Sequence, residues 1–157
     1  MKTLIVYYSY GGNTRRIARM LQEQLGADMA EIATVQPYTG SYDAVVNQGK
    51  EEVESGAMPA IRPMDKDPAD YDTILLGTPV WWYTFAPAVK TFLAGHDFTG
   101  KAVYPFITNG GWIGHTEKDI AAACPGANVM PGIDIRFEEN RLAASVEAIR
   151  RWAQGIG

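Results

Sequence analysis

The chain has 157 residues, a formal net charge of −4 and one cysteine, Cys124. This length suits a single domain, residues 1–157, with a substantial core. The lone cysteine excludes an internal disulfide framework, so we expect a buried structural thiol and a cytoplasmic protein. The chain has no run of basic residues of the kind that would predict nucleic-acid binding. No apolar run reaches the ~18–20 residues of a membrane span. His96 and His115 lack the spacing of metal ligands.

Apolar strand-like runs alternate with helical patterns along the chain. We expect strands at 3–8, 29–33, 73–77 and 102–108, and a weaker fifth strand over 129–135 that Pro131 and Gly132 interrupt. We expect helices at 13–25, 42–54, 86–93, 116–123 and 139–154, with Thr116 capping the fourth, and a surface loop over 59–68. This alternation predicts an α/β protein, a single doubly wound domain with helices on both faces of a parallel sheet.

The polar turn over residues 9–14 links the first strand to the first helix. Such a turn presents backbone N–H groups and the positive end of a helix dipole, and Ser9 and Thr14 add hydroxyl donors. Gly11 and Gly12 permit close approach of a ligand, so the turn suits a phosphate group. The alternative is an unliganded turn in which Asn13 or Thr14 caps the helix.

Two further loops follow strands and belong at the same edge of a parallel sheet. Residues 78–83 place large aromatic side chains after a strand, where we expect them to be exposed and suited to stacking on a flat ring. The third loop, residues 108–114, contains three glycines, which leave backbone N–H groups available to meet ring carbonyls and nitrogens. The alternatives are a core corner or protein interface for residues 78–83 and a flexible turn for residues 108–114.

Together the three loops predict a planar cofactor with one phosphate, flavin mononucleotide (FMN), because the glycine fingerprint of a dinucleotide site is missing. The predicted cofactor-binding residues are Ser9, Tyr10, Gly11, Gly12, Asn13, Thr14, Thr78, Pro79, Val80, Trp81, Trp82, Tyr83, Thr108, Asn109, Gly110 and Gly111. No catalytic acid, base or nucleophile is predicted. We expect Asp97, Glu117 and Asp119 to be solvated surface carboxylates.

Residues 7–14, 77–93, 108–111 and 124–127 resemble the flavodoxin family, and the resemblance covers essentially the whole chain. It implies a five-stranded parallel sheet in the order 2-1-3-4-5 and noncovalent FMN. Ser9 and Thr14 would donate hydroxyls to the phosphate, amides of residues 10–13 would complete the cradle, residues 81–83 would cover one ring face, and residues 108–111 would line the pyrimidine edge. Gly11 departs from the family's usual Thr, and the second loop has no glycine after Trp81.

The resemblance implies a low-potential electron-transfer carrier, served by a reductase and an electron acceptor as redox partner proteins. We expect a monomer or weak dimer. The alternative is an enzyme on the same fold, a small NAD(P)H-dependent quinone or flavin reductase. The aromatic second loop and the modest acidity of the chain motivate this alternative.

Overall fold

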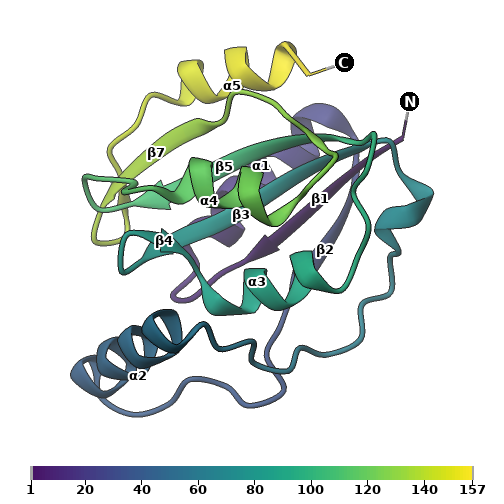
Figure 1. Ribbon diagram of the computed structural model, residues 1–157. Coiled ribbons are helices and arrows are strands. Elements are labelled where there is room, and N and C mark those ends of the chain that lie inside the picture. Colours follow the sequence, from purple (N-terminus) through teal and green to yellow (C-terminus); the bar gives the residue numbers. More distant parts are fainter. Residues whose placement is uncertain (1, 157) are drawn as a thin grey trace.

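The computed structural model describes residues 2–156 as a mostly parallel sheet covered by helices on both faces (Figure 1). The five long strands are β1 (Thr3–Tyr8), β2 (Asp28–Ile32), β3 (Thr73–Trp81), β5 (Ala102–Asn109) and β7 (Ile133–Glu138). Three two-residue strands complete the sheet: β4 (Thr84–Phe85), β6 (Asn128–Val129) and β8 (Arg141–Leu142). The helices are α1 (Asn13–Leu25), α2 (Tyr42–Ser55), α3 (Pro87–Ala94), α4 (Thr116–Ala123) and α5 (Val146–Gln154), with a short 3-10 helix at Pro68–Asp70.

The strand order confirms the predicted doubly wound α/β class. The sheet runs β2-β1-β3-β5-β7-β8, and its five long strands are all parallel. The strand count differs from the prediction, with eight strands in place of five, because short antiparallel strands extend β3 and β7 and the predicted fifth strand is divided into two.

The weak fifth strand is split into β6 and β7, which both pair with β5. The gap lies at Pro131 and Gly132, the two residues expected to interrupt it. Proline has no N–H to give to the ladder, and the Gly132 N–H donates instead to Glu117 Oε1 at 3.1 Å.

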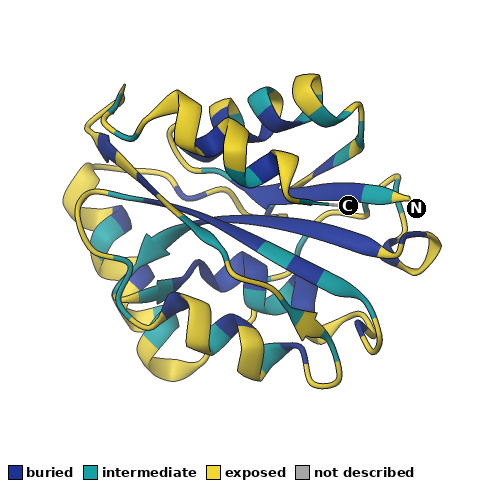
Figure 2. Ribbon diagram, turned by 90° about the horizontal axis from the view of Figure 1, so that it is seen from above, coloured by how far each residue is buried: buried dark blue, intermediate teal, exposed yellow. Residues whose placement is uncertain are grey.

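The core has two halves, one on each face of the sheet. Alternate residues of β1 enter opposite halves, as the two-residue period of a strand requires. Leu4 and Val6 pack with α3 and α4, whereas Ile5 and Tyr7 pack with α1 and α5. Figure 2 shows the central strands as continuously buried, which is typical of a parallel sheet covered on both faces.

The start of α5 and the cap of α4 differ from the sequence-based expectation, whereas α4 has its predicted bounds. Residues 139–145 were expected to be helical, but α5 begins at Val146, and the Ser145 hydroxyl caps it by accepting from the Ala148 N–H at 3.2 Å. The chain before it turns back at Glu139, where φ is 55°, to form β8. Thr116 does not cap α4: its hydroxyl donates to the Ile113 carbonyl at 2.5 Å.

Helix α2 lies apart from the sheet, at the lower left of Figure 1. It contacts α3 and the end of β3. Long connections join it to β2 and to the 3-10 helix, and the first is tied to the second by a bridge between Thr34 and Ile61. Among residues 2–156, no helix is both long enough and apolar enough to cross a bilayer.

Candidate functional site

The N-terminus of α1 has no side-chain cap. Gly12 occupies the cap position with φ 100°, and this residue has no side chain with which to cap the helix. The side-chain bond to the first turn comes instead from Ser9, whose hydroxyl accepts from the Arg15 N–H. The Asn13 amide instead donates to the Glu139 carbonyl at 2.9 Å, and the Thr14 hydroxyl is hydrogen-bonded to Thr108. The alternative in which Asn13 or Thr14 caps the helix is therefore wrong, and the helix start is available to an anion.

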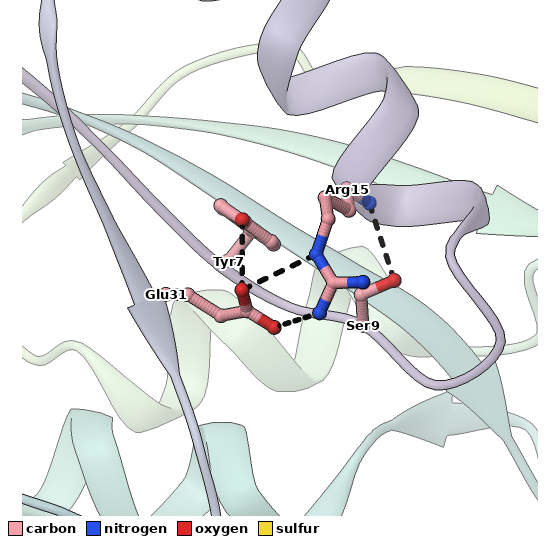
Figure 3. A network of polar contacts seen from close by, with 4 residues as sticks. All are labelled: Tyr7, Ser9, Arg15 and Glu31. Carbon is pink, nitrogen blue, oxygen red and sulfur yellow. Dashed lines mark hydrogen bonds and ion pairs between the residues drawn. The ribbon is translucent and has the colours of Figure 1, made fainter.

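Ser9 closes this turn from the strand side (Figure 3). Its Oγ accepts a hydrogen bond from the Arg15 backbone N–H at 3.2 Å, so the hydroxyl proton remains available for a ligand. The Arg15 side chain points to Glu31 on β2, where Nη2 lies 2.5 Å from Oε2. The guanidinium is therefore paired with Glu31 and not with the Ser9 hydroxyl. Glu31 also accepts from the Tyr7 hydroxyl at 3.1 Å.

The contacts of this network raise the pKa of two of its members, Tyr7 and Arg15. Burial raises the pKa of Tyr7, and the negative charge of Glu31 raises it further. The hydrogen bond to Glu31 raises the pKa of the Arg15 guanidinium. The contact between the Arg15 guanidinium and the Glu31 carboxylate ties the first turn of α1 to β2.

The first and third predicted loops meet at two buried hydroxyls. Thr14 Oγ1 and Thr108 Oγ1 are 2.7 Å apart, and both residues are almost fully buried. They border a cavity of about 350 Å³. All three predicted loops contribute to its walls, with Tyr10, Asn13 and Thr14 from the first, Pro79 and Val80 from the second, and Thr108, Asn109 and Gly110 from the third.

The second predicted loop is a tight hairpin between β3 and β4. Its turn residues, Trp82 and Tyr83, have φ values of 50° and 72°. A two-residue turn with positive φ at both positions favours Asn and Gly, so two aromatic residues here store strain. The Tyr83 carbonyl accepts from the His115 N–H at 2.8 Å, and Trp82 Nε1 donates to the Val46 carbonyl at 3.0 Å. These bonds from two other elements hold the turn in place.

Asp119 anchors the same hairpin, although it was expected to be a solvated carboxylate. Its Oδ2 accepts from the Thr84 hydroxyl at 2.6 Å and is also paired with His115 Nδ1. Glu117 likewise has a structural partner, the Gly132 N–H. The expectation of a solvated carboxylate is therefore wrong for Asp119, which is half-buried, whereas Glu117 and Asp97 are exposed as expected.

An open cavity of about 460 Å³ lies between the hairpin and the third loop. Its walls are Val80, Trp82, Tyr83, Gly110, Gly111 and Trp112. The rings of Tyr83 and Trp112 have centroids 5.2 Å apart, and the two side chains are 51% and 65% exposed. Exposed aromatic rings beside glycine N–H groups are suited to a flat heterocycle.

The third loop is held in shape by Asn109. Its Oδ1 accepts from the Gly111 N–H at 2.9 Å, and its amide donates to the carboxylate of Asp134 on β7. These two bonds favour an ordered loop over the alternative of a flexible turn.

Two second-loop residues lie away from the open cavity. Thr78 is fully buried, and its hydroxyl donates to the Pro79 carbonyl and accepts from the Ala86 N–H. Trp81 is half-buried and packs edge-on against Tyr38, with centroids 4.9 Å apart. The expected exposure of the aromatic loop therefore holds for Tyr83 but is wrong for both tryptophans, because Trp82 is also half-buried by its bond to α2.

Sequence reasoning missed four residues that line these cavities: Tyr42, Trp112, Phe137 and Glu139. Trp112 lies within the third loop, next to the predicted residues 108–111, so its aromatic character was a usable signal. Tyr42 opens a helix distant in sequence from the other loops, and only the placement of α2 brings it here.

Comparisons with known proteins agree with this geometry. Residues 2–154 match the family described as Flavodoxin. This chain belongs to the flavodoxin family. Flavodoxin 1 of Escherichia coli K12 is 30% identical over 112 residues, which cover 66% of this chain and 47% of that protein. The chain therefore spans about half the length of the curated flavodoxins it matches.

Solved structures extend the similarity over the whole chain. A candidate flavoprotein from Bacteroides eggerthii has 32% identity and a TM-score of 0.83, covering 99% of this chain and 97% of that one. A flavoprotein from Lactobacillus acidophilus in complex with FMN has 24% identity and a TM-score of 0.73, covering 85% and 92%. Membership of the flavodoxin family confirms FMN as the cofactor expected of this chain at the level of the family.

Proposed function

We propose that this chain binds FMN noncovalently across the two adjoining cavities and acts as a low-potential electron-transfer carrier. The observation that carries the proposal is the continuity of the cavities. Val80 and Gly110 line both of them, so the uncapped start of α1 and the aromatic walls form one site. FMN has this same arrangement, with a phosphate at one end and a planar ring at the other.

The phosphate end fits the helix start. Gly11 and Gly12 have φ values of 87° and 100°, and no atom lies within 4 Å of where a Cβ would stand on either residue. The space above the backbone is open, and the N–H groups of residues 10–13 would hold the phosphate there with the hydroxyls of Ser9 and Thr14.

The ring end fits the open cavity. Tyr83, Trp82 and Trp112 would cover the flavin, and the N–H groups of Gly110 and Gly111 would meet its polar edge. FMN, when bound, supplies reversible electron transfer. None of the six wall residues is charged. An apolar aromatic setting in an acidic protein disfavours added negative charge on the ring, which supports a low potential.

Exposed Tyr83 and Trp112 at the rim would give partner proteins close access to the ring. We propose a reductase and an electron acceptor as these partners, in the cytoplasm, with the chain a monomer or weak dimer. A net charge of −4 supports only modest electrostatic steering toward a basic partner.

The test is reduction of the FMN-loaded protein under anaerobic conditions. A carrier should not be bleached by NADH or NADPH alone, and it should be bleached quickly once a flavodoxin reductase is added. Rapid bleaching by NADPH without a reductase would reject the carrier and favour the reductase. One observation favours the quinone or flavin reductase as a second candidate function. A third cavity, beneath α2, borders the proposed flavin site.

A further inference from the structure

We propose that the cavity beneath α2 is a second binding site, which takes an uncharged planar aromatic molecule the size of a naphthoquinone. The cavity has a volume of about 290 Å³, near the lower limit of roughly 300 Å³ for small-molecule sites. Its existence does not depend on FMN. Only the position of its ligand beside a flavin rests on the proposed function.

The walls select the chemistry of the ligand. Tyr42, Val45 and Val46 line one side and Trp81 and Trp82 line the other. None of these side chains is charged at neutral pH, so they offer no partner to an ion that loses its hydration on entry. The Lys50 ammonium lies outside these walls, 5.3 Å from the centroid of the Trp82 ring, and would repel a cation. Aromatic and aliphatic walls favour a flat apolar ring.

The cavity is a built feature of the fold. Trp82 Nε1 donates to the Val46 carbonyl at 3.0 Å, which fixes the middle of α2 to the hairpin. Gly49 lets the helix approach Trp81 closely, because a Cβ at this position would lie only 3.1 Å from Cε3 of the indole. Helix and hairpin are therefore held at a set separation, with the space between them open.

The cavity adjoins the proposed flavin site. Val80 and Trp82 line both this cavity and the open one, and Tyr10 and Tyr42 line both this cavity and the phosphate end. An aromatic ligand here would contact the face or the edge of the Trp82 indole that lies away from the open cavity. Only the Trp82 side chain would then separate this ligand from the flavin. A ligand that accepts electrons would be well placed to receive them.

The flavin ring itself is the competing occupant. The open cavity offers it the N–H groups of the third loop, whereas the only glycine beneath α2 is Gly49, which lies inside a helix. We therefore place the flavin in the open cavity and the second ring beneath α2.

The test is calorimetric titration of the protein with menadione, 2-methyl-1,4-naphthoquinone, with and without bound FMN. The filling variant is Val46→Trp. The matched control is Asn47→Trp, which adds the same indole at the next, exposed position of α2. We expect one menadione site in the protein with FMN and in the protein without it. Val46→Trp should weaken menadione binding at least tenfold, and Asn47→Trp should leave it unchanged. FMN affinity should be unchanged in both variants.

Each other result overturns the inference. Menadione that fails to bind the native protein, or that binds Val46→Trp as well as the control, leaves no site beneath α2. Menadione that displaces FMN, or a Val46→Trp protein that loses FMN, places the flavin ring in this cavity. Should Val46→Trp not fold, Val46→Asp tests the same wall with a charge and should weaken menadione at least tenfold. Failure of the native protein to bind FMN would refute the proposed function separately.

Discussion

The hydroxyl of Thr14 lies 2.7 Å from the hydroxyl of Thr108, and this buried contact joins the start of α1 to the end of β5. The two residues are 94 positions apart in the chain, and they meet because β1 and β5 flank β3 in parallel. The contact ties the start of α1 to the third loop, the two segments that the proposed FMN site brings together.

Replacing Thr108 by Val should lower the free energy of unfolding by about 1–2 kcal/mol, since the Thr14 hydroxyl is left buried without a partner. The double variant Thr14→Val with Thr108→Val should lose less free energy of unfolding than the two single variants lose together, because no hydroxyl is left buried without a partner. Urea denaturation of the four proteins measures this coupling. Strictly additive effects would show that the two hydroxyls do not interact.

Replacing Ser9 by Ala should weaken FMN binding about tenfold, because one hydroxyl donor to the phosphate is lost. Riboflavin has no phosphate and should bind more weakly than FMN. Its affinity should be the same for the native protein and for Ser9→Ala. Quenching of flavin fluorescence measures both affinities. An equal loss for the two flavins would place Ser9 away from the phosphate.

Replacing Tyr83 by Gly should separate stability from binding. The change removes the strain of a positive φ, worth about 1 kcal/mol, and also removes the ring that packs against Trp112. We expect the free energy of unfolding to stay within about 1 kcal/mol of the native value while FMN affinity falls. A large loss of stability with unchanged FMN affinity would show that Tyr83 serves the fold alone.

Gly77, in the middle of β3, and Gly110, directly after β5, should respond differently to replacement by Ala. At Gly77 a new Cβ would lie 2.3 Å from the Phe106 ring, so Gly77→Ala should cost about 1–3 kcal/mol or more. At Gly110 nothing lies within 4 Å of the new Cβ, so Gly110→Ala should change stability by less than about 0.5 kcal/mol. Thermal or urea unfolding of the two variants checks the contrast. Similar losses at both positions would contradict the described packing.

Cys124 should be unreactive in the folded protein. Burial raises the pKa of its thiol to about 11, so the reactive thiolate is scarce at pH 8. The folded state holds this proton more tightly than the unfolded state does, so the contribution to stability is complete below a pH of about 8.5 and is lost as the pH rises toward 11. Iodoacetamide at pH 8 should modify the denatured chain much faster than the native one. Equal rates would show that the thiol is accessible.

The sequence was sufficient for elements whose determinants are local. Helix α1 has the predicted bounds because a glycine turn precedes it and Gly26, with φ 63°, ends it. Strand β1 also has its predicted bounds, since its apolar run is bordered by polar residues on both sides.

The errors arose where distant contacts decide the structure. Residues 139–145 have a helical pattern, but the Arg136 carbonyl accepts from the N–H groups of Ala143 and Ala144 and draws this segment into the β7–β8 hairpin. The burial of Trp82 depends on a carbonyl of α2, and nothing local in the sequence places that helix against the hairpin.

The crystal structure of the protein with FMN tests the central claim most directly. The account predicts the phosphate at the start of α1, bonded to the N–H groups of residues 10–13 and to Ser9, with the ring between Tyr83 or Trp112 and the glycines of the third loop. A phosphate bound elsewhere, or a flavin ring lying beneath α2, would contradict it.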